Sequence, residues 1–598
     1  MVETYEMPWR PNFELAAAAG WGASASLCLT IGAASGLPLS PFAWMAALGG
    51  GMGVHRAYQA WRHHQRKARL AGKRLKFASI KELQAHMKPG AIWLGNGFEW
   101  DQPHTQLCYE ILKRDKSKIL PKVEQMGAPW IHGVSMSEED LQLPINDTKG
   151  HLLVVGTTGS GKTRLFDLLV TQAILRGESV IIIDPKGDRE LRENAQRACA
   201  ALGKPEKFVW FHPGFPEKSA RIDPMKNFSR ATELASRIAN LLPGEGPADP
   251  FKSYAQMALN NVVQGLVLTG RQPNLVNIRS HLEGGLDDLV IRSVSIWCEK
   301  QIEMWEDEAK PFLSNAKGKD GKALALIRYY REKVHHRAPN TDLEGLLSMF
   351  EHDRTHFGKM IASLLPLLGQ LTSGHMGGLL SPNRNNDFDE RPIVDMASVI
   401  NLGQVCYIGL DSLTDAMVGS AIGSILLADL ASVAGDRYNY GVNNTPVNIF
   451  VDEAAEVVND PLIQILNKGR GAELRLLIAT QTFADFVTRL GSEPKARQVL
   501  GNVNNLISLR VTDNETQTYI TDGLPTVRVK YVMTTQGSSI GTGGHETMQF
   551  GGNAGERLME EEAELFTPAL LGQLPNLEFV AKVSGGRLLK GRLPILKE

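Results

Sequence analysis

Apolar residues follow three different patterns along the chain, and each pattern predicts a different kind of element. Residues 15–55 contain no Asp, Glu, Lys or Arg, which is typical of membrane-spanning helices. Between residues 229 and 375, apolar residues recur at three- and four-residue spacing, which indicates packed helices. Short apolar runs that end in polar residues predict buried strands of an α/β sheet. These runs are HLLVV (151–155), SVIIID (179–184), VCYIGLD (405–411), VNIFVD (447–452) and LRLLIATQ (474–481).

The uncharged stretch at residues 15–55 is too long for one membrane span. A single helix of that length would measure about 60 Å, roughly twice the hydrocarbon thickness. The segment SGLPLSP at 35–41 opposes continuous helix, so we expect two spans, near 15–35 and 38–55, joined by a tight turn. A cleaved signal peptide is disfavoured because the leading residues are acidic and the apolar part is too long. A buried helical hairpin in a soluble protein is the remaining alternative.

A strongly basic run follows the uncharged stretch. Residues 55–76 hold eight Lys or Arg and no acid, whereas the whole 598-residue chain has a formal net charge of −1. Because Lys and Arg concentrate on the cytoplasmic side of membrane spans, we interpret this run as the cytoplasmic flank of a two-span hairpin. The bulk of the chain would then lie in the cytoplasm. Contact between the run and DNA is a second possibility.

Composition argues against two other classes of site. The five cysteines are scattered without a CxxC or a Cys/His cluster, which tells against structural zinc and a disulfide framework and fits a reducing compartment. The histidines at 55, 63 and 64 have no third ligand nearby in the sequence. The length predicts two or three domains.

The clearest chemical motif is GTTGSGKT at residues 156–163, which satisfies the P-loop pattern G-x-x-x-x-G-K-[ST]. An apolar strand precedes it and an amphipathic helix follows it, which is the context that a P-loop requires. Its glycines allow backbone N–H groups to close on phosphate oxygens at a helix N-terminus. Lys162 can reach the β- and γ-phosphates of ATP, and the Thr163 hydroxyl can ligate Mg²⁺. The predicted nucleotide-binding residues are Gly156, Thr157, Thr158, Gly159, Ser160, Gly161, Lys162, Thr163 and Arg164.

Two later strands end in acids, and either could supply the carboxylate that the metal needs. One ends in Asp184, within DPKGD, and the other in Asp452 and Glu453. Hydrolysis needs a metal ligand and a base that activates water, and only the second strand offers adjacent acids. We therefore assign Asp452 to Mg²⁺ and Glu453 to catalysis. Two interpretations stay open for Asp184 and Lys186: they lie in a ligand-facing loop at a strand end, or they form a structural turn.

Two further polar residues are candidates for the catalytic site. Gln481 ends an apolar run and could sense the γ-phosphate, although an amide at a strand end is often a turn former. Arg470 lies in the Gly-flanked segment NKGRGAELR and could act as an arginine finger on the nucleotide of a neighbouring subunit. A solvated surface arginine is the alternative. Arg475 and Arg510 are weaker candidates for the same role.

The order of the motifs resembles a known family. The N-terminal span pair is followed by GTTGSGKT, DPKGD, RIDPM, FVDEAAE, GRGAELRLLIATQT and GNVNNLISLRVTD. This order is similar to that of conjugative coupling proteins, the TraD/TraG-like ATPases of type IV secretion systems, and most of all to the TraD type of integrating conjugative elements. GAPWIHGV before the P-loop and GGRLLKGRLPIL near the carboxyl end strengthen the resemblance.

The resemblance implies a fold, a set of partners and a place in the cell. It implies a RecA-like ATPase that forms a homo-hexamer on the bacterial inner membrane and uses ATP with Mg²⁺. Its partners would be single-stranded DNA, with double-stranded DNA as the alternative, the relaxase of the relaxosome and inner-membrane components of the secretion channel. The same likeness carries nucleotide binding over to Lys162 and Thr163, the Walker B role to Asp452 and Glu453, and the sensor and finger roles to Gln481 and Arg470. The long acidic tail that some members use for docking is not matched, so the route of substrate recruitment is left open.

The fold class expected is therefore α/β, a RecA-like P-loop ATPase with an inserted all-α domain and an N-terminal two-helix transmembrane hairpin. Within the helical part, the basic segment around Tyr329 and Tyr330 could contact single-stranded DNA or form an ordinary amphipathic helix. The Gly-, Ser- and Thr-rich residues 534–555 predict a loop. The predicted domains are the hairpin (1–55), a basic lead-in segment (56–145), the first ATPase part (146–228), the helical insertion (229–375) and the second ATPase part (376–598).

Three other functions compete with DNA export. An FtsK-like septal translocase of double-stranded DNA uses the same motor, but such proteins usually carry more spans and a winged-helix domain, of which we find no sign after residue 500. A P-loop kinase for a small molecule is disfavoured by the spans, the helical insertion and the paired acids. A membrane scaffold without hydrolysis is disfavoured by the intact P-loop.

Overall fold

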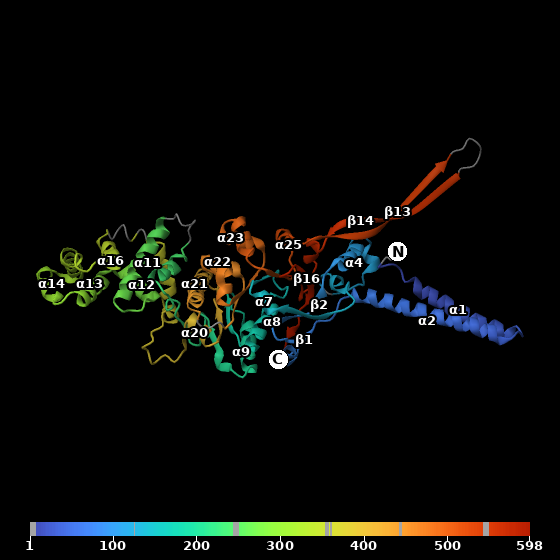
Figure 1. Ribbon diagram of the computed structural model, residues 1–598, viewed down its shortest axis with the longest axis horizontal. Coiled ribbons are helices and arrows are strands. Elements are labelled where there is room, and N and C mark those ends of the chain that lie inside the picture. The colour runs from blue at the N-terminus through green and yellow to red at the C-terminus, as the bar shows by residue number, and fades with distance from the viewer. Residues whose placement is uncertain are drawn as a thin grey trace.

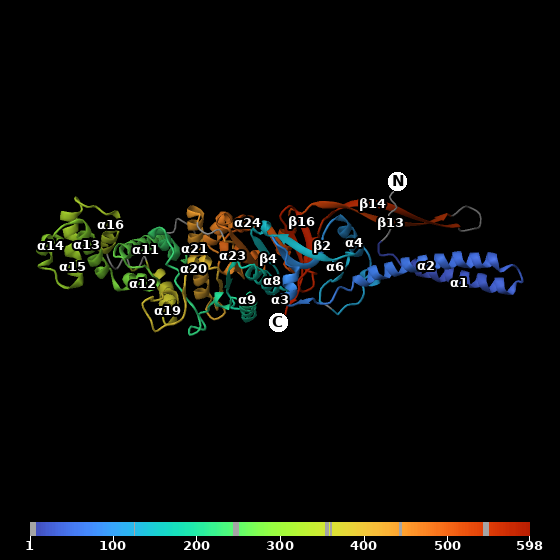
Figure 2. The ribbon, with the colours of Figure 1, turned by 60° about the horizontal axis from the view of Figure 1, so that its bottom comes forward.

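The computed structural model is elongated, with a sheet in the middle, a helical domain at one end and two long hairpins at the other (Figure 1). Figure 2 shows that the helical domain and the N-terminal helix pair stay at opposite ends when the molecule is turned. The structure describes residues 8–124, 126–242, 250–352, 358, 361–441, 445–541 and 549–597.

The uncharged stretch forms two antiparallel helices, α1 (Phe13–Ala34) and α2 (Leu39–Arg69), as predicted. Small residues let the helices approach closely: a Cβ atom added at Gly49 would lie 3.3 Å from the Cβ of Ala25. Large apolar side chains such as Leu27 and Leu48 point outward and are exposed. A helix pair with small residues inside and apolar residues outside is suited to a lipid environment.

The second helix is longer than predicted, because it runs through the basic segment to Arg69 instead of ending near residue 55. Lys and Arg are good helix formers, and the helix ends only before Gly72, which has a φ of 82°. Among the described residues, α1 and α21 (Ala416–Tyr440) are long and apolar enough to cross a membrane. Since 67% of the apolar window of α21 is buried in the protein, α1 is the candidate span of the two.

The central sheet has eleven strands in the order β3-β2-β16-β15-β12-β4-β11-β10-β5-β9-β6. The part from β12 to β6 is parallel, and the part from β12 to β3 is antiparallel. The parallel strands are β4 (Leu152–Val155), β5 (Ser179–Asp184), β6 (Phe208–Phe211), β9 (Val405–Gly409), β10 (Val447–Val451), β11 (Leu474–Thr480) and β12 (Asn505–Ser508). The antiparallel strands are β2 (Ala91–Glu99), β3 (Glu139–Pro144), β15 (Glu578–Val583) and β16 (Arg587–Arg592).

Helices cover both faces of the parallel part, which explains why its strands are apolar throughout. Val154 and Ile182 face the core beneath α8 and α9, whereas Leu153 and Ile183 face the core beneath α21 and α22. The predicted α/β fold with a P-loop and a helical insertion is confirmed. The covering helices are α8 (Lys162–Leu175), α9 (Arg189–Ala201), α20 (Met396–Asn401), α21 and α22 (Asp460–Lys468). Later in the chain come α23 (Phe483–Leu490), α24 (Glu493–Leu500), α25 (Asn514–Thr521) and α26 (Pro568–Leu571).

The lead-in segment contributes more to the sheet than its sequence predicts. It supplies β2 and β3, and β2 pairs antiparallel with β16 from the carboxyl end of the chain. This pairing joins residues nearly five hundred positions apart, so no local pattern encodes it. The other elements of this region are β1 (Phe77–Ala78), α3 (Ile80–His86), α4 (Gln102–Leu112), α5 (Lys116–Ile119), α6 (Trp130–Gly133) and α7 (Ile145–Thr148). β1 pairs with β17 (Ile595–Leu596), which lies near the carboxyl end of the chain.

The helical insertion leaves and rejoins the sheet domain through β7 (Arg221–Ile222) and β8 (Ile393–Val394), which pair with each other in parallel. The domain boundaries at 229 and 375 remain a prediction. Among the described residues, the α-helices between these strands are α10 (Ala231–Ala239), α11 (Pro250–Leu268), α12 (Leu275–Gly284), α13 (Asp287–Gln301), α14 (Trp305–Leu313), α15 (Gly318–Tyr329), α16 (Thr341–Glu351), α18 (Leu364–Thr372) and α19 (His375–Leu380).

The paired tyrosines of the insertion are core residues. Tyr329 and Tyr330 are 0% and 1% exposed, and the Tyr330 hydroxyl accepts a hydrogen bond from the Asn340 backbone N–H at 3.0 Å. Buried rings cannot stack on bases, so this geometry tells against the DNA-contact reading of the segment and favours ordinary helix packing.

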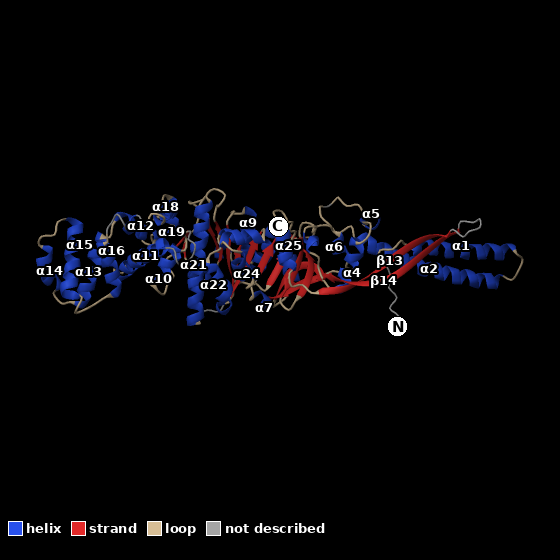
Figure 3. Ribbon diagram, turned by 90° about the horizontal axis from the view of Figure 1, so that it is seen from above, coloured by secondary structure: helices blue, strands red, loops and turns tan. Residues whose placement is uncertain are grey.

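The prediction of a loop at 534–555 is wrong for the residues that the structure describes. They belong to a long antiparallel hairpin, β13 (Thr526–Gly541) and β14 (Gln549–Glu564), which projects beyond the sheet (Figure 3). Residues 542–548, between the two strands in the sequence, lie outside the described residues. Gln106 of α4 anchors the base of the hairpin, because its amide exchanges two 2.7 Å hydrogen bonds with the Lys530 backbone. Backbone pairing of this kind leaves no hydrophobic pattern in a Gly- and Ser-rich sequence.

Candidate active site

The P-loop connects the end of β4 to the start of α8. Gly159 and Gly161 have φ values of 74° and 118°, which side chains rarely tolerate. A Cβ atom at Gly156 would lie 2.6 Å from the Ser160 hydroxyl oxygen. Because Gly161 caps α8, the N–H groups of its first turn are free of intrahelical partners and can bind phosphate.

Lys162 is buried at the centre of this loop. Its Nζ donates to the Gly156 carbonyl at 2.7 Å and lies 3.7 Å from Glu453 Oε1. Burial lowers the pKa of Lys162, against the opposing charges of Glu453 and Asp452. The structure therefore brings together the P-loop lysine and an acid 291 positions later in the sequence.

The order of the strands in the sheet explains why Lys162 lies close to Glu453. β11 lies between β4 and β10, so the carboxyl ends of the three strands share one edge. Asp452 and Glu453 follow β10 at that edge and are both buried. Burial raises the pKa of Asp452 to about 6, together with the charges of Asp184 and Glu453. A carboxylate crowded by other acids gains stability from a nearby cation.

Glu453 is held in a strained conformation by several donors. Its φ is 40°, a left-handed conformation that non-glycine residues adopt at a cost and often at functional sites. Its Oε1 accepts hydrogen bonds from Lys186 Nζ at 2.6 Å and from Gln481 Nε2 at 2.9 Å. Burial raises the pKa of Glu453, but the hydrogen bond from Lys186, the charge of Lys162 and the bond from Gln481 lower it below its ordinary value overall.

Gln481 links the acid to the P-loop. Its Oε1 accepts the Thr158 hydroxyl at 3.1 Å while its Nε2 donates to Glu453. One side chain at the end of β11 thus touches both halves of the site. Lys162, Glu453 and Gln481, which are three of the predicted site residues, are brought together.

In the DPKGD segment, Asp184 has the role of a structural turn residue, whereas Lys186 faces the site. Asp184 is buried and shapes the turn, because it accepts the backbone N–H groups of Lys186 at 3.0 Å and Asp188 at 2.7 Å and the Tyr407 hydroxyl at 2.6 Å. Lys186 instead reaches into the site and pairs with Glu453. Sequence reasoning left this lysine open, since only the adjacency of β5 and β10 reveals the contact.

Other predicted residues have different surroundings. Arg164 pairs with Glu190 at 2.9 Å, so its guanidinium is engaged by protein. Thr157 donates its N–H and hydroxyl to the Arg510 carbonyl at 2.9 and 3.1 Å, which ties the loop to the end of β12. Arg475 is buried in an ion pair with Glu178 at 3.0 Å, which removes it as a finger candidate.

Arg470 does not join the site within one chain. It lies on a turn before β11, whereas the P-loop meets the far end of that strand. Its side chain is exposed and lines a cavity of about 680 Å³ together with Lys149, Tyr438 and Glu473.

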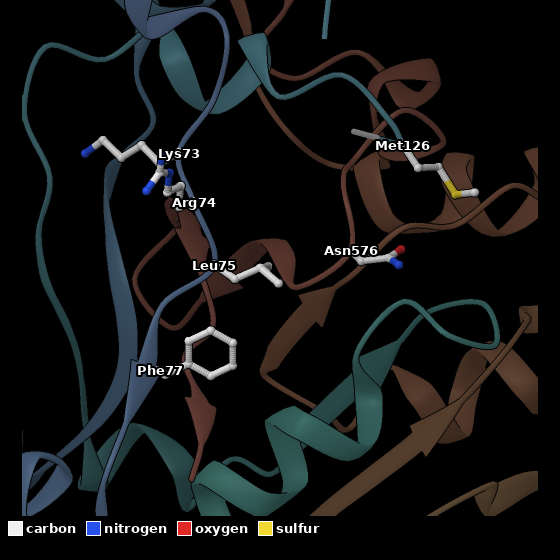
Figure 4. Close-up of a pocket in the computed structure, with 6 residues that line it drawn as sticks. All are labelled: Lys73, Arg74, Leu75, Phe77, Met126 and Asn576. Atoms are coloured by element: carbon white, nitrogen blue, oxygen red, sulfur yellow. The ribbon is translucent and has the colours of Figure 1, made fainter. Parts of the chain in front are cut away.

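A second cavity, of about 570 Å³, opens after α2 (Figure 4). It is lined by Lys73, Arg74, Leu75, Phe77, Met126 and Asn576. None of these is a predicted site residue, and none is an acid, so the cavity offers no base for hydrolysis.

Two family models match parts of the chain. Residues 446–576 match the model described as the TraM recognition site of TraD and TraG. Residues 132–234 match the model of the central domain of the helicase HerA. Among curated proteins, the urease accessory protein UreG 2 of Streptomyces griseus subsp. griseus is 32% identical over 111 residues, which are 18% of this chain. The chain spans about half of that relative, 46% of its length.

Solved structures of similar shape have low sequence identity. The unbound bacterial conjugative coupling protein TrwBdeltaN70 is 16% identical, with 86% of this chain and 97% of that chain covered and a TM-score of 0.49. A complex of TrwB with the ATP analogue ADPNP has a TM-score of 0.47 at the same identity, with 86% and 96% covered. VirB4 of Thermoanaerobacter pseudethanolicus is 15% identical, with 74% and 88% covered and a TM-score of 0.38.

The matched TraD/TraG domain includes the acids of the site. It begins at residue 446, immediately before β10, and contains Asp452, Glu453 and Gln481. The HerA-type match contains the P-loop with Lys162. The two matched domains meet where Lys162 approaches Glu453. We conclude that this chain combines a P-loop part that matches the HerA central domain with a domain that matches TraD and TraG, and that the two parts share one site.

Proposed function

We propose that this chain is a membrane-anchored hexameric motor that couples a relaxase-bound DNA strand to a type IV secretion channel and drives DNA transfer by ATP hydrolysis. The observation that carries the proposal is the contact of Lys162 and Gln481 with Glu453, at an edge shared by the P-loop and the TraD/TraG domain. That arrangement supplies a phosphate-binding loop and a buried acid in one place.

The site residues fit ATP with Mg²⁺. Lys162 and the N–H groups of residues 156–164 would bind the phosphates. Thr163 and Asp452 would hold Mg²⁺, since a hydroxyl and a carboxylate are ligands that this cation prefers. When bound, Mg²⁺ neutralises charge on the β- and γ-phosphates. Glu453 would orient and deprotonate the attacking water, and Gln481 would report the γ-phosphate to the P-loop through Thr158.

The N-terminal hairpin supports a place at the inner membrane. α1 and the first part of α2 would span the bilayer, and the basic second part of α2 would lie on the cytoplasmic side. Six copies would surround the transferred DNA, held largely through its phosphates. The relaxase and the inner-membrane channel components are the protein partners of this proposal.

A mating assay tests the function as a whole. In a donor that lacks the gene, we expect the wild-type chain to restore transfer and the Lys162→Ala chain to leave it at least a hundredfold lower, because a motor without nucleotide does no work. Transfer frequency and growth are measured together. Normal transfer with Lys162→Ala would contradict the proposal. A growth or chromosome-segregation defect in place of a transfer defect would favour the FtsK-like septal pump.

We assign Arg470 to the nucleotide of a neighbouring subunit, because it is exposed and lies at the sheet edge opposite to its own P-loop. Arg470→Ala and Lys162→Ala chains should each hydrolyse little ATP alone. Mixed, they should recover part of the activity, since some interfaces then combine an intact Lys162 with an intact Arg470. Hydrolysis by defined mixtures is the measurement. An additive response without recovery would remove Arg470 from the site.

A further inference from the structure

One oxygen of Glu453 lies close to the side-chain nitrogens of Lys186, Gln481 and Lys162. Oε1 lies 2.6 Å from Lys186 Nζ, 2.9 Å from Gln481 Nε2 and 3.7 Å from Lys162 Nζ. The Glu453 side chain is only 8% exposed. A carboxylate oxygen that already accepts two hydrogen bonds has both of its lone pairs occupied and cannot also accept one from water. In this arrangement Glu453 is therefore restrained from activating water.

Lys186, which donates to Glu453, lies in a tightly packed loop, but its side chain is exposed. The Pro185 carbonyl accepts the N–H and the hydroxyl of Ser412, both at 2.8 Å, and Asp184 closes the turn beneath it. A Cβ atom at Gly187 would lie 2.7 Å from His212 Nε2, so the loop packs tightly. The Lys186 side chain is nevertheless 40% exposed. Its ammonium can therefore change partner while the backbone stays in place.

The position of this ammonium is informative, because the base must approach the γ-phosphate through one water molecule. With ATP bound, an ammonium 2.6 Å from the base oxygen would therefore lie near that phosphate. Among the described residues, Lys186 has no ion-pair partner other than Glu453. Its charge is thus available to a stronger anion, and the terminal phosphate of ATP carries more negative charge than a carboxylate.

We propose that Lys186 is a γ-phosphate sensor, which holds Glu453 inactive in the empty site and transfers its ammonium to the γ-phosphate of bound ATP, so that Glu453 is released to act as the base. The proposal rests on the proposed function of the site as an ATPase. It adds a residue and a control step: the base is unlocked only when a third phosphate is present. ADP, which lacks that phosphate, leaves the lysine on Glu453.

The test is to measure ATP and ADP affinity of the full-length chain in detergent, for Lys186→Met, Lys186→Arg and a control. Methionine keeps length without charge. We expect Lys186→Met to weaken ATP binding by roughly tenfold or more, the effect of losing one charge-assisted hydrogen bond, and to leave ADP binding unchanged. Lys186→Arg should recover most of the ATP affinity. Arg189→Met is the matched control, because it removes an exposed cation nearby that pairs only with Glu193 among the described residues.

A double substitution isolates the pairing with Glu453. In the Glu453→Gln chain, the phosphate no longer competes with a carboxylate for Lys186, so ATP should bind several-fold tighter than in the wild type. This gain should vanish in Lys186→Met/Glu453→Gln. Equal affinities of Lys186→Met and wild type for ATP, or an equal loss for ATP and ADP, would overturn the inference while leaving the ATPase proposal intact. A wild-type chain that binds neither nucleotide would overturn both.

Discussion

Replacing Lys162 by alanine is expected to reduce ATP binding and hydrolysis by at least a hundredfold. The ammonium lies at the centre of the P-loop, 2.7 Å from the Gly156 carbonyl, where nothing else can supply positive charge to the β- and γ-phosphates from within the loop. Loss of one preorganised donor to developing charge costs 10²–10³ in rate. Binding of a fluorescent ATP analogue and release of phosphate by the purified full-length chain are the measurements.

The matched control is Lys204→Ala, which removes an exposed lysine before β6. It should bind and hydrolyse ATP as the wild type does. Glu453 keeps Lys186 and Gln481 as partners in Lys162→Ala, so we expect the fold to survive. Wild-type nucleotide affinity in Lys162→Ala would show that the loop at 156–163 is not the nucleotide site.

The second large effect is expected from Glu453→Gln, which should bind ATP and fail to turn it over. Glutamine has the same shape, and its carbonyl oxygen can still accept from Lys186 and Gln481, so the site geometry is retained. An amide cannot take a proton from water, and loss of a general base typically costs 10²–10⁴ in rate. Retention of labelled ATP, measured beside steady-state hydrolysis, separates binding from turnover.

Glu456→Gln controls for the loss of a carboxylate in the same loop. Glu456 Oε2 accepts the Ser412 hydroxyl at 3.0 Å, and a glutamine can accept it equally. Turnover in this variant should stay within a few-fold of the wild type. If Glu453→Gln hydrolyses ATP at the wild-type rate, then Glu453 is not the base, and Asp184 becomes the acid to examine.

Much of the site could be predicted because its parts are local. The P-loop is a continuous motif, and its glycines are required by the φ values at 159 and 161. The assignment of Asp452 and Glu453 over Asp184 used only the chemical need for two acids, and the structure places Glu453 3.7 Å from Lys162. Lys186 could not be assigned in this way, because DPKGD is equally a turn sequence. The residue that Lys186 contacts, Glu453, lies 267 positions later in the sequence.

The amino-acid sequence by itself determined the elements whose signal is periodic or contiguous: the helix pair that the uncharged stretch forms, the apolar strands with polar ends, the helical insertion and the P-loop. These follow from the solvation of each side chain and from backbone geometry, which are properties of short segments. Only the tertiary structure decided the long-range relations. These are the order of strands that brings Lys162, Lys186 and Gln481 onto one carboxylate oxygen, the burial of Tyr329 and Tyr330, the addition of β2 and β3 to the sheet, and the hairpin at 526–564. Such pairings are selected by the free energy of the whole fold, because backbone hydrogen bonds between distant strands leave no periodic mark on either strand.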